Sequence, residues 1–153
     1  MRMSDEDAPE DPMATGRLDR TTMRTLGRRA ETHPLVESWR FEPDQITPRS
    51  LVISLRSTAY PAETEAARIE VYWFVTSDYY FHYVEDRGTT RFQCRCDRPP
   101  KTDAPRSHFH PPPNANGVES SPLDDHHLDV LFSVLDWVAE RVEQLHDEPN
   151  RTG

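Results

Sequence analysis

Lysine is almost missing from this chain of 153 residues. Lys101 is the only one, the other 17 basic residues are arginines, and 27 acidic residues give a formal net charge of −9. A generic nucleic-acid-binding domain carries a basic patch and a high isoelectric point, so the composition excludes that class and leaves only local binding through a few arginines. The acid excess with so little lysine predicts a haloarchaeal protein, and a GC-rich genome with an acidic tail is the alternative. At molar salt the Debye length is about 3 Å, so distant carboxylates would scarcely repel a phosphate.

Cysteine and long apolar runs are scarce as well. Cys94 and Cys96 are two residues apart on one predicted strand, where side chains point the same way but are poorly placed for a disulfide. We predict that they are small apolar core residues, and a metal role is the alternative, although zinc sites usually have a longer cysteine spacing. No apolar run approaches the ~18 residues of a membrane span, and the acidic N-terminus does not resemble a signal peptide. A cytoplasmic location without a membrane partner is expected.

The length predicts one domain, over residues 17–146, and the helices and strands predicted below make it an α+β domain. The charged, Pro-containing segment 1–16 is expected to be a disordered acidic tail, and residues 147–153 a flexible one. Alternating apolar, β-branched and aromatic residues predict five strands, at 35–41, 50–56, 67–76, 79–85 and 90–97. These would form an antiparallel meander sheet of about five strands.

Two amphipathic helices complete the predicted fold. A short one is expected over residues 17–32, and a long one over residues 121–146 with Ser121 as N-cap and Pro122 in the first turn. The long helix carries one apolar stripe from Leu128 to Leu145 and should pack on one face of the sheet. Three tryptophans, Trp39, Trp73 and Trp137, are predicted to be core aromatics.

The last predicted hairpin concentrates polar chemistry on one face. Because side chains alternate along a strand, the face should carry Tyr80 and His82 from one strand and Arg91, Gln93, Arg95 and Asp97 from the next. A two-residue turn at Arg87-Gly88 would place His82 opposite Gln93 and Tyr80 opposite Arg95. Arginine binds a phosphodiester well because its planar fork donates two parallel hydrogen bonds. A solvated sheet face with no function is the alternative.

Residues 98–120 contain too many prolines for a regular element and are predicted to form a long Pro/His-rich loop. Loops of this length tend to be functional or disordered. In an extended segment the imidazoles of His108 and His110 would project the same way, which suits a metal site or an acid–base pair. A metal would need a third ligand, for which His82, Asp97 and His126 are candidates. A plain surface loop remains the alternative.

Four stretches, taken in order, resemble the TumE family of prokaryotic toxin–antitoxin toxins. They are YFHY at 80–83, RFQCRCDRPPK at 91–101, HFHP at 108–111 and the acidic PLDD helix start at 122–125. The resemblance spans about residues 35–145 and depends on order and spacing. Two departures stand out: Cys96 replaces a common aromatic, and His108-Phe-His110 replaces a denser histidine cluster.

The resemblance implies the toxin component of a type II toxin–antitoxin system, neutralised by a helix-turn-helix antitoxin encoded next to it. Toxins of this size commonly act on RNA, so RNA binding or metal-independent cleavage without a cofactor is the expectation. Mapped onto this chain as a hypothesis, His108 or His110 is the base, and the other or His82 is the acid. Arg95 and Arg91 would hold the phosphate, with Tyr80 and Asp97 completing the substrate-binding set.

Two other functions remain open at this point. The first is a non-catalytic protein-interaction module that uses the sheet edge and the loop. The second is a metal-dependent hydrolase that uses His108 and His110.

Overall fold

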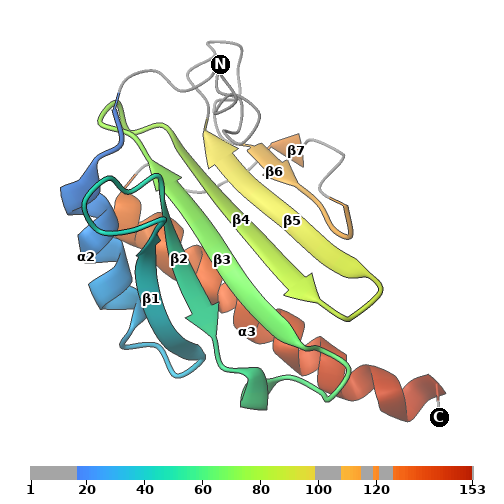
Figure 1. The fold of residues 1–153 in the computed structure, drawn as a ribbon. Helices are drawn as coiled ribbons and strands as arrows, with labels where there is room; N and C mark the ends of the chain where they lie inside the picture. The colour runs from blue at the N-terminus through green and yellow to red at the C-terminus, as the bar shows by residue number, and fades with distance from the viewer. Residues whose placement is uncertain (1–16, 99–107, 115–118, 121–125, 153) are drawn as a thin grey trace.

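The computed structural model describes residues 17–98, 108–114, 119–120 and 126–152. One antiparallel sheet holds seven strands in the order of the chain (Figure 1). They are β1 (Val36–Glu42), β2 (Ser50–Leu55), β3 (Ala66–Trp73), β4 (Tyr79–Asp86), β5 (Arg91–Arg98), β6 (His108–His110) and β7 (Glu119–Ser120). The helices are α2 (Arg20–Ala30), the 3-10 turn η2 (Ser57–Ala59) and α3 (His127–Thr152). The predicted α+β class with a five-stranded meander is confirmed, and β6 and β7 extend it.

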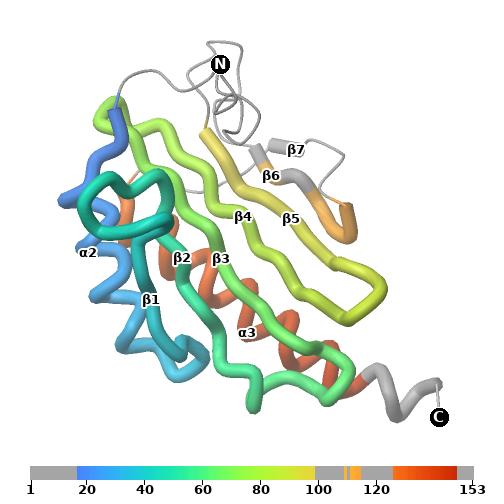
Figure 2. The backbone as a smooth tube through the Cα atoms, in the orientation of Figure 1, coloured from blue at the N-terminus to red at the C-terminus, as the bar shows by residue number. Residues whose placement is uncertain are grey.

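Both long helices lie on the same side of the sheet. The backbone trace passes from strand to neighbouring strand without a crossover, while α3 runs diagonally behind the sheet and α2 lies beside β1 (Figure 2). Among the described residues, no helix is long and apolar enough to cross a membrane. The other side of the sheet carries no described helix, and we call it the open face.

α2 begins where Asp19 caps it. The Asp19 carboxylate accepts hydrogen bonds from the backbone N–H of Thr22 at 3.0 Å and from its hydroxyl at 2.8 Å, which satisfies the first-turn donors. Met23, Leu26, Gly27 and Ala30 form its buried side. A Cβ on Gly27 would lie 2.4 Å from the Trp39 ring, so glycine is required for the close approach of α2 to β1. The helix is slightly shorter than the predicted 17–32.

The core lies between the sheet and α3. Alternate residues of the strands, such as Ile69, Val71, Phe81 and Tyr83, point toward the helix and are buried. The predicted apolar stripe of α3 packs against them, from Val130 to Leu145. Trp73 is buried in this core, and Trp39 and Trp137 pack against it, which confirms the prediction for the tryptophans.

The limits of α3 differ from the prediction. The helix begins at His127 and ends at Thr152, so the expected end at about His146 was too early and the helix includes most of the expected C-terminal tail. The expected cap at Ser121 and Pro122 and the expected acidic tail at 1–16 lie outside the described residues. The strand expected at 67–76 ends at Trp73, because Phe74–Asp78 forms a turn in which Ser77 has a φ of 72°.

The prediction that residues 98–120 contain no regular element was wrong. β6 pairs with β5, and β7 pairs with β6. The three residues of β6 contain no proline, and the run Pro111–Pro113 follows the strand instead of interrupting it. The outer edge of β5 presents unpaired backbone groups, and β6 satisfies part of that edge.

The register of the β4–β5 hairpin also differs from the prediction. Asp86 pairs with Arg91, so the connection is Arg87–Thr90, with Gly88 at a φ of 83°, and not a two-residue turn. His82 therefore lies opposite Arg95, and Tyr80 opposite Asp97. The shift equals two residues, an even number, so every side chain keeps the face that was predicted for it.

Candidate functional site

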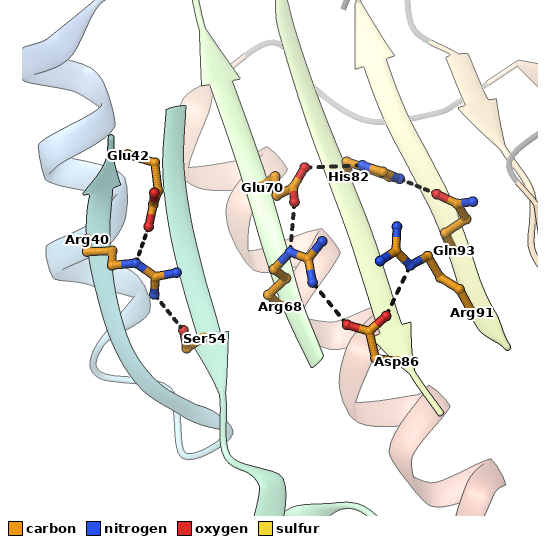
Figure 3. Close-up of polar contacts among 9 residues, drawn as sticks. All are labelled: Arg40, Glu42, Ser54, Arg68, Glu70, His82, Asp86, Arg91 and Gln93. Carbon is orange, nitrogen blue, oxygen red and sulfur yellow. Dashed lines mark hydrogen bonds and ion pairs between the residues drawn. The ribbon is translucent and has the colours of Figure 1, made fainter. Parts of the chain in front are cut away.

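The open face carries a chain of polar contacts across three strands. Figure 3 shows hydrogen bonds and ion pairs that run from Arg68 and Glu70 on β3 to His82 and Asp86 on β4 and on to Arg91 and Gln93 on β5, with Arg40, Glu42 and Ser54 as a separate group on β1 and β2. These residues occupy alternate positions of their strands, which is why they meet on one face.

Three arginines on this face pair with an acid two residues later on the same strand. The pairs are Arg40–Glu42, Arg68–Glu70 at 2.7 Å and Arg95–Asp97 at 2.9 Å. The spacing works because residues i and i+2 of a strand are neighbours on one face. Each guanidinium is thus close to a carboxylate, and the open face is a surface of mixed charge instead of a basic patch.

His82 is held from both sides. Its Nε2–H donates to Gln93 Oε1 at 2.7 Å, and its Nδ1 lies 3.4 Å from Glu70 Oε1. The hydrogen bond from His82 and the neighbouring Arg68 guanidinium lower the pKa of Glu70 to about 2. Glu70 is therefore an anion at neutral pH, and it fixes the orientation of the imidazole.

Arg95 lies directly opposite His82. Its Cζ is 5.8 Å from the centre of the Tyr80 ring, a cation–π arrangement, and its Nε donates to Asp97 at 2.9 Å. About a third of the Arg95 side chain is exposed, whereas Asp97 and Tyr80 are buried. Tyr80 and Asp97 therefore contact the buried side of the guanidinium and are themselves hardly exposed to solvent.

β6 brings the His-x-His motif beside these residues. In the β5–β6 register His110 pairs with Arg95, and His108 pairs with Asp97. The backbone N–H of Gln93 donates to the carbonyl of Pro113 at 2.7 Å, which continues the contact beyond the strand. Six of the seven predicted site residues thus occupy neighbouring positions on β4, β5 and β6.

Arg91 is the predicted residue that does not join this group. It lies opposite Asp86 and donates to that carboxylate at 3.0 Å, at the far end of β5 from β6. The two-residue register difference moved it away from His82.

The side chains of His108 and His110 lie outside the described part of the structure. Among the side chains that the structure describes, no group of three or more His, Cys, Asp or Glu is arranged to hold an ion. His126 stacks on His127 with ring centres 4.6 Å apart, and His127 lies against Trp73. Trp73 belongs to the helix side of the sheet, so His126 is not a neighbour of His82.

The cysteines behave as predicted. Both are free, Cys94 is buried and Cys96 is half-buried against the core. Burial raises the pKa of both thiols, that of Cys96 to about 12, which disfavours the thiolate that a metal or an electrophile would need.

A buried polar cluster between β4 and α3 was missed. Arg141 donates twice to Glu85, at 2.7 and 3.0 Å, and Tyr83 donates to the same carboxylate at 2.8 Å. The hydroxyls of Tyr60 and Tyr83 are 2.7 Å apart, and burial raises the pKa of both phenols. A signal was present in the sequence: Glu85 and Arg141 are opposite charges that each occupy a core-facing position of an otherwise apolar element.

The chain is also similar in sequence to a known protein family. The family model described as Toxin TumE matches residues 25–142, from within α2 to within α3. No curated protein and no solved structure shows a match.

Proposed function

Because the chain belongs to the TumE toxin family, we propose that it is the toxin of a type II toxin–antitoxin pair and that it cleaves RNA on the open face at β4, β5 and β6. Its partner would be a helix-turn-helix antitoxin encoded by the neighbouring gene. The observation that carries the proposal is the β5–β6 register, which pairs His110 with Arg95 and His108 with Asp97.

The proposed reaction needs a base, an acid and a cation. The base, His108 or His110, takes the proton of a ribose 2′-hydroxyl, whose oxygen then attacks the adjacent phosphorus. The bond from phosphorus to the 5′-oxygen breaks, and the acid gives that oxygen a proton. Arg95 stabilises the charge that develops on the phosphate oxygens. The products are a 2′,3′-cyclic phosphate and a free 5′-hydroxyl.

The neighbours of Arg95 have supporting roles in this proposal. Tyr80 is 5% exposed, so it positions the guanidinium and does not stack on a base. Asp97 orients the same group through its 2.9 Å contact with Nε. Both nitrogens of His82 lie beside side-chain oxygens, of Gln93 and Glu70, which hold the imidazole in place for the proposed role of the acid. Arg91, 53% exposed, would hold a phosphate farther along the strand.

Growth arrest tests the proposal. The wild-type chain, expressed without the neighbouring gene, should stop growth and cleave RNA, and co-expression of that gene should relieve the arrest. R95A should lose at least about 100-fold in cleavage, the usual effect of removing one charge-stabilising donor, and H110Q should lose cleavage as well. Primer extension on total RNA measures the cleavage.

R40A is the matched control, because Arg40 belongs to the same kind of pair on the same face but lies on β1, away from β6. It should keep full toxicity. Since R95A leaves Asp97 buried without its cation, R95Q/D97N is a second variant in which both charges are removed. Full toxicity of folded R95A and R95Q/D97N would rule the proposal out.

One observation favours the alternative of a protein-interaction module. The paired charges of the open face suit a polar protein surface as well as a phosphate. Growth arrest without any RNA cleavage, lost in R95A, would support that function.

A further inference from the structure

The solvent side of α2 is made of arginine and threonine. Arg17, just before the helix, and Arg20, Arg24 and Arg28 within it are exposed, and we call these four residues the α2 arginine stripe. No carboxylate occurs between Arg20 and Ala30. In a chain with a net charge of −9, this is a local surface of the opposite sign.

The stripe differs in its ion pairing from the arginines of the open face. Among ion pairs between described residues, every arginine involved belongs to the sheet, its connections or α3; they are Arg40, Arg56, Arg68, Arg87, Arg91, Arg95 and Arg141. None of these described pairs includes a stripe residue. The carboxylates that flank α2 among the described residues are engaged locally: Asp19 caps the helix, and Glu31 accepts from Trp39 Nε1 at 3.2 Å.

Two arginines of the stripe have side-chain contacts, and the three on α2 are regularly spaced. Arg20 Nη1 donates to the carbonyl of Ile46 at 3.1 Å, and Arg24 lies 5.6 Å from the centre of the Phe41 ring. Arg20, Arg24 and Arg28 follow one another at four-residue intervals, about 6 Å apart along the helix axis and on one side of it. A row of evenly spaced cations fits a polymer with one anion per unit.

The surroundings favour a polynucleotide over a protein. Protein interfaces are built around an apolar centre with aromatic anchors, whereas protein–nucleic-acid interfaces are more polar and much more positively charged. Among the described residues the exposed large apolar side chains are Ile46 and Val75. Neither lies on α2, but each borders the stripe through one backbone contact, Ile46 with Arg20 and Val75 with Arg17. Two separate aliphatic residues at its border do not form an apolar centre with aromatic anchors, so charge dominates the stripe.

We infer that the α2 arginine stripe binds the phosphate backbone of single-stranded RNA, independently of sequence. The choice of RNA rests on the proposed function. α2 lies beside β1, at the opposite end of the sheet from β6 (Figure 1), so the stripe is a second surface. It would supply affinity for the RNA, while the open face supplies the chemistry.

Fluorescence anisotropy with a labelled 20-nucleotide oligo(U) tests the inference. Each phosphate contact on a single strand contributes about 0.7 to the slope of log K against log salt. R24Q/R28Q should therefore flatten the slope by about 1.4 and weaken binding at 0.1 M salt by about 25-fold. R24K/R28K keeps the charge and should bind like the wild type.

R40Q/R56Q is the matched control, because it lowers the net charge equally but removes arginines that already pair with Glu42 and Glu37. It should change the slope by less than about 0.5. Equal losses in R24Q/R28Q and R40Q/R56Q would reduce the effect to net charge and overturn the inference. Wild-type affinity in folded R24Q/R28Q, or no oligo(U) binding by the wild type at 0.05 M salt, would also overturn it. Tighter binding of a labelled poly-glutamate peptide than of oligo(U) would assign the stripe to an acidic protein instead.

The two proposals can fail separately. If R24Q/R28Q binds oligo(U) normally while R95A abolishes toxicity, the inference falls and the proposed function stands. If R24Q/R28Q weakens binding while R95A remains toxic, the proposed function falls and the stripe is still an RNA-binding surface.

Discussion

Glu70 lies between Arg68 and His82 near the middle of the open face, and both neighbours stabilise its charged form. Its pKa is lowered to about 2 from an ordinary value of 4.5. A carboxylate whose pKa is lower in the folded state contributes stability above its unfolded pKa, and this stability is lost as the pH falls through the folded pKa. The relevant window is therefore about pH 4.5 to 2.

E70Q should reduce the free energy of unfolding at pH 7 by on the order of 2–3 kcal/mol. The difference from the wild type should shrink steadily between pH 5 and pH 2, because the wild type loses the charge there as well. Urea unfolding at pH 7, 5 and 3 measures it. E63Q, which removes an exposed carboxylate from the β2–β3 connection, controls for the loss of one negative charge. A difference that does not depend on pH would contradict this account of Glu70.

At the scale of elements, the pair Glu85–Arg141 joins β4 to α3 inside the core. Glu85 is fully buried, Arg141 is nearly so, and its guanidinium also lies 3.5 Å over the Phe92 ring. Buried ion pairs add little stability in themselves, but removal of one partner leaves an uncompensated charge. The pair therefore fixes the position of α3 along the sheet.

R141M should destabilise the fold by about 3–5 kcal/mol, because Glu85 loses its main partner inside the protein. E85Q/R141M should cost clearly less, since neither charge remains and the new amide oxygen can still accept from Tyr83. Urea unfolding of the single and double variants gives the comparison. If R141M lies within about 1 kcal/mol of the wild type, the pair does not hold α3 in place.

At the scale of the whole molecule, we expect that part of the acidic excess, the carboxylates of residues 1–16, is not needed for folding. The core residues run from Met23 to Leu145, and the described contacts begin at Arg17, whose carbonyl accepts from Val75. Residues 1–16 hold five carboxylates and one arginine, so their removal changes the net charge from −9 to −5. The fold should need none of them.

Deletion of residues 1–16 should leave the thermal midpoint within about 2 °C of the wild type, because the described core, from Met23 to Leu145, is kept whole. It should also strengthen oligo(U) binding several-fold at low salt, since five carboxylates that precede the α2 arginine stripe in the sequence are removed. Thermal unfolding and anisotropy check the two parts. A large drop in the midpoint would show that the segment belongs to the folded domain.

Much of the fold was predictable because its signals are local. A period of two along the strands and of about 3.6 along α3 separates buried from exposed positions without knowledge of any partner. This periodicity placed His82, Arg95 and Asp97 on the open face and Tyr83 on the helix side. It also identified the five main strands and the apolar stripe of α3.

The remaining features depend on contacts between distant segments. The β4–β5 register follows from how Arg87–Thr90 closes the hairpin, and a difference of two residues leaves the alternation unchanged, so the pattern could not reveal that Arg95 faces His82. β6 forms because the backbone groups at the edge of β5 need hydrogen-bond partners. The sequence of three residues next to a run of prolines gives no local sign of this pairing. The sequence by itself, through its local periodicity, thus determined which face of the sheet each side chain occupies. Only the tertiary structure, through the β4–β5 turn and the pairing of β6 with the edge of β5, decided which residues lie next to one another in the proposed site.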